Sequence, residues 1–300
     1  MPERPLTILS VHAHPDDESS KGAATIAKYV QRGVRAVLVT ATGGEEGDIL
    51  NPAMESPEVR ENLAAVRSAE LDAATAIIGY HRVVRLGYRD SGMPDTPANA
   101  RPEAFWNVPI EESTAALVAV IREERPHVIL TYGEDQSGYP HPDHLRVHDI
   151  SVRAFEVAGD PSYRPDLGVP FQPSKLYYSI WSKKRMLALV DKFEELGIES
   201  PFSRERLERE GQDHLITTEI DIRAHLHVQR EALLAHKTQI DPESPFWFGL
   251  SIADQSDAFG VEVYQLAKVG DPSLVLPGGE VETDLFARIA IGSNAGVTEH

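Results

Sequence analysis

The sequence predicts an α/β protein of the Rossmann-like type: a three-layer sandwich with a mostly parallel sheet and a C-terminal elaboration. Two observations favour this class. Over the first 160 residues, short apolar runs alternate with segments of helical periodicity, which is typical of strand–helix–strand units. The apolar runs are bounded by polar turns, as expected of buried strands.

The expected elements follow one another at short spacing. Strands are predicted at 6–12, 34–41, 82–87 and 127–132, and helices at 21–33, 58–79, 111–126 and 143–157. Gly33 and Gly79 end the first two helical patterns, a common place for glycine. Past residue 160 the pattern loosens. Strands are expected there at 175–181 and 215–222, and helices at 183–197 and 223–239.

The tail from Ile240 onward is rich in Pro, Gly and aromatic residues and shows little periodicity. The sequence contains no low-complexity linker that would separate two folded units. We therefore expect a single domain over residues 1–300, with a core at about 6–160 and the elaboration at about 161–300.

Composition excludes several classes of protein. The formal net charge is −18, and Lys and Arg form no cluster, so nucleic acid and anionic membranes are poor partners. The chain has no cysteine, so any metal must be held by His and carboxylate side chains. The N-terminal apolar run is too short for a signal peptide, and no stretch approaches the ~18 apolar residues of a membrane span. We expect a cytoplasmic protein.

Two similar turns follow two of the predicted strands: HPDD at 14–17 and HPDH at 141–144. Ligands of parallel sheets bind outside the carboxyl ends of the strands, so we expect the two turns to meet there. A catalytic zinc ion takes three His or carboxylate ligands and keeps one position for water. We predict that His14, Asp17 and His144 are these ligands.

The other polar residues of the two turns are then free to act in catalysis. Asp16 is the expected general base for an attacking water. His141, as a cation, is expected to stabilise an oxyanion or to protonate a leaving amine. Asp143 is expected to hold the His141 ring, and the Tyr139 hydroxyl to reach the same oxyanion.

Plainer interpretations of these turns stay open. A Pro-Asp-Asp run before a helix could simply cap the N-terminus of that helix and have no other role. His148, four residues after His144 on a predicted helix, could rival it as a ligand. His12 could face the same way as His14.

Three further segments were weighed in the same way. The TGGEEGD loop (42–48) lacks the spacing of a phosphate-binding loop, so the rim of a pocket that binds hydroxyls or a cation is favoured. Asp90 could bind sugar hydroxyls or could form a plain turn. Arg67 is expected on a solvated helix face.

Several stretches together resemble the LmbE-like, or PIG-L, family of zinc-dependent deacetylases. They occur in family order over about residues 6–240: VHAHPDDES, TGGEEGD, VRSAEL, LGYRDSGM, GYPHPDHLRVH and ALLAHKTQI. The resemblance implies a Rossmann-like fold and hydrolysis of an N-acyl group from an aminosugar. It also implies the roles predicted above for the two turns, with Tyr139 as a mobile helper. The His-His-Asp set suits Zn²⁺ and tolerates Fe²⁺ or Co²⁺.

Within the mycothiol branch of this family, the chain is more similar to the enzymes that cleave the glucosamine amide of cysteine S-conjugates than to the deacetylases of mycothiol synthesis. The products would be glucosaminyl-inositol and a cysteine S-conjugate, a step in thiol-based detoxification. The branch implies contacts from Asp48, Arg67 and Asp90 to inositol and glucosamine. Met93 lies in the same motif as Asp90. Lys21 at the rim would meet the polar end of a larger acyl group.

Three alternatives remain beside this hypothesis. The same chemistry could deacetylate N-acetylglucosaminyl-inositol or another N-acyl aminosugar. The fold could also carry a non-catalytic sugar-binding protein, which the complete set of predicted ligands and base disfavours. A nucleotide-binding oxidoreductase is disfavoured because the glycine fingerprint is missing. The expected partner is a small aminosugar–inositol thiol conjugate.

Overall fold

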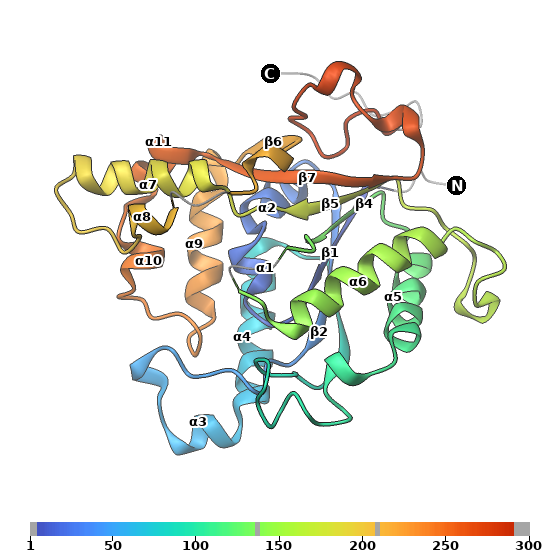
Figure 1. Ribbon diagram of the computed structural model, residues 1–300, viewed down its shortest axis with the longest axis horizontal. Coiled ribbons are helices and arrows are strands. Elements are labelled where there is room, and N and C mark those ends of the chain that lie inside the picture. Colours follow the sequence, from blue (N-terminus) through green and yellow to red (C-terminus); the bar gives the residue numbers. More distant parts are fainter. Residues whose placement is uncertain (1–4, 136–138, 208–210, 291–300) are drawn as a thin grey trace.

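The computed structural model describes residues 5–135, 139–207 and 211–290 (Figure 1). Its centre is a seven-stranded sheet of order β3-β2-β1-β4-β5-β7-β6. The strands are β1 (Thr7–His12), β2 (Arg35–Thr42), β3 (Arg82–Tyr88), β4 (Val128–Tyr132), β5 (Lys175–Ser179), β6 (Thr218–Asp221) and β7 (Val261–Val269). β1 to β5 run parallel, and β7 is antiparallel to both β5 and β6. The predicted α/β class is confirmed.

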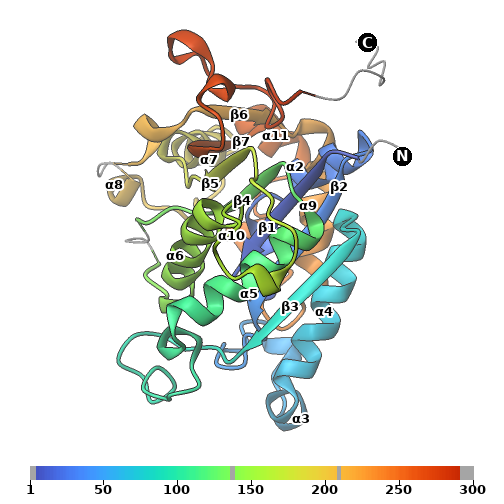
Figure 2. The same cartoon turned by 90° about the vertical axis from the view of Figure 1, so that its right-hand side faces the viewer.

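Helices cover both faces of the sheet. They are α1 (Asp17–Ser20), α2 (Ala23–Gln31), α3 (Pro57–Glu61), α4 (Leu63–Ile78), α5 (Ile110–Glu124), α6 (Pro142–Val157), α7 (Lys183–Glu195), α8 (Arg204–Leu207), α9 (Leu226–Ala235), α10 (Pro245–Phe248) and α11 (Ile252–Phe259). α2, α4 and α9 pack together on one face, and α5 and α6 on the other (Figures 1 and 2). A hydrophobic core lies on each face of the sheet. Successive residues of a strand point to opposite faces, so Ile8 packs into one core and Leu9 into the other.

Local residues explain where the helices begin and end. Gly79, in a left-handed conformation with φ 95°, ends α4 as predicted. The pattern expected to form one helix at 58–79 is divided at Asn62 into α3 and α4. The helix expected from residue 21 begins at Ala23, because Gly22 has φ 102° and separates α2 from the short α1.

No strand or helix was predicted after residue 240, where the structure has both. β7 is a nine-residue strand between β5 and β6, and α11 precedes it. Its sequence, VEVYQLAKV, mixes charged and apolar residues, which suits an antiparallel strand that is only partly buried. Of the helices in the described residues, none is long and apolar enough to cross a membrane.

The sheet reverses its direction of growth between β1 and β4. β2 and β3 extend the sheet on one side of β1, whereas β4 and β5 extend it on the other. The loops after β1 and β4 therefore diverge at their carboxyl ends and leave a crevice, the usual ligand position in open α/β sheets. The two HPD turns follow these two strands.

Candidate active site

One cavity of about 1010 Å³ opens at the carboxyl ends of β1 and β4. Every residue predicted to bind metal or substrate or to act in catalysis, except Asp143, lines it: His14, Asp16, Asp17, Lys21, Asp48, Arg67, Asp90, Met93, Tyr139, His141 and His144. The topology therefore gathers residues from five separate segments into a single site.

His14, Asp17 and His144 form a compact group of metal-ligand type. One ligand atom from each lies within 4.8 Å of the others, and all three residues are buried. The Asp17 Oδ2 atom is 3.6 Å from His14 Nδ1 and 3.4 Å from His144 Nε2. Two imidazole nitrogens and one carboxylate are the donor set of a catalytic zinc site, so these residues fit such an ion.

The Asp17 carboxylate is fixed by groups from three elements. Its Oδ2 accepts hydrogen bonds from the Tyr132 hydroxyl at 2.6 Å and from the His14 backbone N–H at 3.0 Å. Its Oδ1 lies 2.6 Å from Lys21 Nζ. Burial opposes ionisation, but Lys21 and His144 hold the pKa of Asp17 well below its usual range. The carboxylate is therefore charged and oriented before any ligand arrives.

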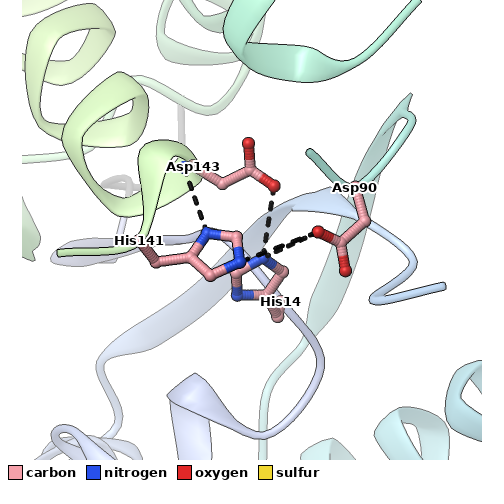
Figure 3. A group of neighbouring side chains, drawn as sticks. All are labelled: His14, Asp90, His141 and Asp143. Carbon is pink, nitrogen blue, oxygen red and sulfur yellow. Dashed lines mark hydrogen bonds and ion pairs between the residues drawn. The ribbon is translucent and has the colours of Figure 1, made fainter. Parts of the chain in front are cut away.

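Figure 3 shows a second group beside the first, made of His14, Asp90, His141 and Asp143. His14 Nε2 is 3.3 Å from Asp143 Oδ2 and 3.7 Å from Asp90 Oδ1. Backbone N–H groups already engage both carboxylates: Ser91 donates to Asp143, and Gly92 donates to Asp90. Carboxylates in this position commonly orient a metal-binding histidine from behind.

The Asp143 side chain does not lie where the sequence analysis expected it, against His141. The His141 Nδ1 atom accepts the backbone N–H of Asp143 at 3.2 Å, because His141 is the N-cap of α6. The Asp143 carboxylate turns instead toward His14 and Ser91, whose hydroxyl donates to it. Asp143 is fully buried and does not line the cavity.

The surroundings of His141 disfavour the charged form of its imidazole. Burial and the neighbouring His14 lower its pKa to about 4. Since Nδ1 accepts a hydrogen bond, the ring proton is on Nε2, which lies 3.8 Å from Asp90 Oδ1. These surroundings disfavour the cationic His141 expected from the sequence, and a neutral ring has its Nε2–H available as a donor. The half-exposed Tyr139 stacks on it with a centroid separation of 5.9 Å.

Asp16 has a strained backbone that a buried arginine supports. Its φ of 110° is rare for a residue with a side chain. Arg67 Nη2 lies 2.9 Å from Asp16 Oδ2, and the guanidinium also donates to the carbonyls of Pro15 and Gly44 at 2.6 Å. The prediction that Arg67 lies on a solvated helix face is wrong: Arg67 is 3% exposed.

Two glycines of the TGGEEGD loop make room for Arg67. A Cβ atom on Gly44 would lie 2.2 Å from Arg67 Nη1, and one on Gly47 would lie 2.6 Å from the same atom. Gly44 also has φ +70°, which favours glycine. The loop therefore closes over the guanidinium, and no phosphate cradle is formed.

Sequence reasoning missed two buried residues that support Asp16. Glu18 Oε2 accepts the Asp16 backbone N–H at 2.9 Å, and Glu18 Oε1 is 2.7 Å from His236 Nε2. Both residues are fully buried. The signal was present in the quoted stretches VHAHPDDES and ALLAHKTQI, each of which places a polar residue next to an apolar run.

The remaining predicted residues occupy different depths of the cavity. Asp90 is buried, whereas Asp48 is exposed and Met93 is 40% exposed. The rival histidines lie outside both ligand groups found in the described residues. His148 Nδ1 is 3.0 Å from the Tyr132 carbonyl, and His12 packs edge-on against the Tyr132 ring.

Comparisons with known proteins place the chain among deacetylases and amidases. A profile of the PIG-L family, GlcNAc-PI de-N-acetylase, matches residues 9–155. The chain is 41% identical over 271 residues to a 1D-myo-inositol 2-acetamido-2-deoxy-alpha-D-glucopyranoside deacetylase of Geodermatophilus obscurus, covering 87% of this chain and 92% of that relative. It is 42% identical over 296 residues to the mycothiol S-conjugate amidase of Streptomyces coelicolor, covering 95% and 97%.

The fold is similar to that of N,N'-diacetylchitobiose deacetylase from Pyrococcus horikoshii, with a TM-score of 0.60 and 16% identity over 90% of this chain and 88% of that one. Fold and relatives together define an enzyme of the deacetylase and amidase class. The chain belongs to the PIG-L family, as its sequence motifs indicated.

Proposed function

We propose that this enzyme hydrolyses the glucosamine amide of mycothiol S-conjugates and releases glucosaminyl-inositol and a cysteine S-conjugate. The size of the cavity is the observation that favours this reaction over deacetylation. At about 1010 Å³ it is at the upper end of ordinary ligand pockets, and its lining includes Trp181 and Phe246 in addition to the predicted ligands. An acetyl group would leave that part unused.

We further propose that His14, Asp17 and His144 hold a zinc ion, with Fe²⁺ as the alternative metal. Such an ion supplies a water that is nucleophilic near neutral pH and polarises the amide carbonyl. Tyr132 and Asp143 keep two of the proposed ligands, Asp17 and His14, in their orientations.

In this proposal Asp16 accepts the proton of the attacking water and passes it to the amine nitrogen as the C–N bond breaks. It lines the cavity beside the proposed ligands, and burial raises the pKa of its carboxyl group. A raised pKa makes a carboxylate a stronger base near neutral pH. The Arg67 guanidinium holds one carboxylate oxygen and so fixes the direction of proton transfer.

His141 donates its Nε2–H to the amide oxygen as negative charge develops there. Tyr139, stacked on His141 and half exposed, can approach the same oxygen from the mouth of the cavity. Lys21, Asp48, Asp90 and Met93 line the walls and are proposed to contact the substrate.

The test compares hydrolysis of a mycothiol bimane conjugate and of N-acetylglucosaminyl-inositol by the zinc-loaded protein. We expect a higher kcat/KM for the conjugate. Asp16→Asn should lower kcat by about 10²- to 10⁴-fold at unchanged zinc content. Asp166→Asn, in an exposed loop pair with Arg164, is the matched control and should leave both rates unchanged.

Two results would contradict parts of this proposal. A higher kcat/KM for N-acetylglucosaminyl-inositol would favour the alternative function, biosynthetic deacetylation. The deacetylase relative is nearly as similar to this chain as the amidase relative. An Asp16→Asn variant that keeps its zinc and its rate would remove Asp16 from the role of base.

A further inference from the structure

Part of the cavity wall is aromatic and has no role in the proposed chemistry. Trp181, which follows β5, lines it together with Arg185 on α7 and with Phe246 and Trp247 on α10. The same cavity contains the proposed ligands. We call Trp181, Arg185, Phe246 and Glu262 the distal subsite, since all four line this one cavity.

The two distal rings present apolar surface to the cavity. Trp181 is 51% exposed and Phe246 is 40% exposed. Their planes are 16° apart, with centroids separated by 6.3 Å. Phe202 packs edge-on against Phe246 at 5.1 Å, which fixes the ring from behind. Nearly parallel, exposed rings in a cavity are suited to bind a flat apolar group.

Two polar side chains of the same region have atoms without a partner among the described residues. The Arg185 guanidinium makes no hydrogen bond or ion pair with any residue that the structure describes. Glu262 is 7% exposed, and its Oε1 also has no partner there, although Oε2 accepts from the Thr25 N–H and the Tyr264 hydroxyl. Unpaired polar atoms at buried positions are uncommon in folded proteins.

These two groups complement an amide. A guanidinium donates to a carbonyl oxygen, and a carboxylate oxygen accepts from an N–H. A ligand with an amide in a short arm and an aromatic group at its end would therefore satisfy both the polar and the apolar parts of the subsite.

We propose that the distal subsite binds the acyl part of the substrate amide and selects acyl groups that carry an aromatic substituent. Trp181 and Phe246 hold the aromatic group, and Arg185 and Glu262 hold an amide in the arm that precedes it. This inference rests on the proposed function, because it takes the larger part of an S-conjugate as the occupant.

Equilibrium binding tests the subsite without any hydrolysis. The ligands are S-benzyl-N-acetylcysteine methylamide and its S-methyl counterpart, titrated calorimetrically into the full chain. We expect the S-benzyl ligand to bind about tenfold more tightly. Trp181→Ala should weaken S-benzyl binding by about five- to tenfold and leave S-methyl binding unchanged. Phe246→Ala is a second variant with the same expectation.

Two further variants separate the polar part from the apolar part. Arg185→Met should weaken both ligands by a similar factor, because both contain the amide. Trp106→Ala removes an exposed tryptophan that lies under Arg146 outside the cavity, and it should change neither affinity.

Equal affinity of the two ligands for the unmodified protein, or an equal loss of both in Trp181→Ala, would overturn the subsite. These outcomes do not depend on turnover. A protein that prefers N-acetylglucosaminyl-inositol in the activity assay but still binds the S-benzyl ligand through Trp181 would reject the proposed function and keep the subsite.

Discussion

Asp16 depends on Glu18, a buried residue that takes no part in the proposed chemistry. Its positive φ costs energy, and it persists only where neighbours hold it in place. Arg67 holds the carboxylate, and Glu18 holds the backbone N–H. Because Glu18 is in turn paired with His236, a loop more than 200 residues away stabilises the proposed base.

Glu18→Met removes the acceptor for the Asp16 N–H. We expect kcat to fall by about 10- to 100-fold, because a shift of about 1 Å in a catalytic group can have that effect. KM should change little, since Glu18 is buried and does not line the cavity. Glu18→Gln keeps an acceptor and should recover most of the rate. Steady-state kinetics with measured metal content checks this, and equal rates for both variants would contradict it.

The Glu18–His236 pair should also make stability depend on pH. Burial opposes a charge on His236, but the Glu18 carboxylate raises its pKa above the ordinary value of 6.5. A group whose pKa is raised in the folded state stabilises the protein. This contribution is complete at pH values below the ordinary pKa, and it is lost as the pH rises through the folded-state pKa.

The free energy of unfolding of the native protein and of His236→Gln should therefore differ more at about pH 6 than at about pH 9. Urea unfolding at the two pH values measures this difference. A difference that is the same at both would show that the imidazole is not charged in the folded protein.

At the scale of elements, the sequence predicted best what local periodicity determines. β1 and β4 are short apolar runs buried on both faces, and each was located within one residue of its observed bounds. β7 was missed because its polar and apolar residues do not alternate regularly. The ligand group was predicted because parallel topology alone brings the turns after β1 and β4 together.

Contacts between distant elements could not be predicted in this way. Arg67 was expected in solvent because α4 reads as an amphipathic helix, yet the 42–48 loop covers it. The position of the Asp143 carboxylate depends on Ser91, in the loop after β3. Neither of these contacts follows from the spacing of residues along the chain.

The closure of the 42–48 loop over α4 can be tested at Gly44. Gly44→Ala would place a methyl group 2.2 Å from Arg67 Nη1 and displace the support of Asp16. Gly33→Ala is the matched control: φ is +83° and nothing lies within 4 Å. Both variants should lose about 1 kcal/mol of stability from the positive φ, but only Gly44→Ala should lose most of its activity.

Thermal unfolding and initial rates, measured on the same preparations, separate the two effects. Full activity in Gly44→Ala would mean that the loop moves without disturbing Arg67. An equal loss of activity in Gly33→Ala would attribute the effect to general destabilisation instead of the contact with Arg67.

At the scale of the whole molecule, we propose that the segment around Glu282 and the sheet form one folding unit. The segment around Glu282 pairs with β6: the Glu282 N–H donates to the Thr217 carbonyl, and the Glu219 N–H donates to the Glu282 carbonyl, each at 2.8 Å. The Glu282 carboxylate then reaches into the sheet and meets Lys175 Nζ at 2.6 Å and the Tyr177 hydroxyl at 2.5 Å.

This ion pair is almost completely buried, since Lys175 is 0% exposed and Glu282 is 2% exposed. Glu282→Ala would leave the ammonium of Lys175 without a counter-charge inside the protein. Removal of one partner of a buried pair commonly costs about 3–5 kcal/mol, whereas replacement of both by apolar residues is often neutral. We therefore expect Glu282→Ala to lower the free energy of unfolding by about 3–5 kcal/mol. The double variant Lys175→Met/Glu282→Met should recover most of this loss.

Urea unfolding monitored by tryptophan fluorescence measures these differences. Asp166→Ala, which breaks an exposed pair with Arg164, is the control and should cost less than about 1 kcal/mol. If the segment around Glu282 and the sheet form one unit, Glu282→Ala should lower the urea midpoint of a single transition. A separate early transition, with the remainder unfolding at the native midpoint, would instead show that the residues around Glu282 unfold independently of the sheet.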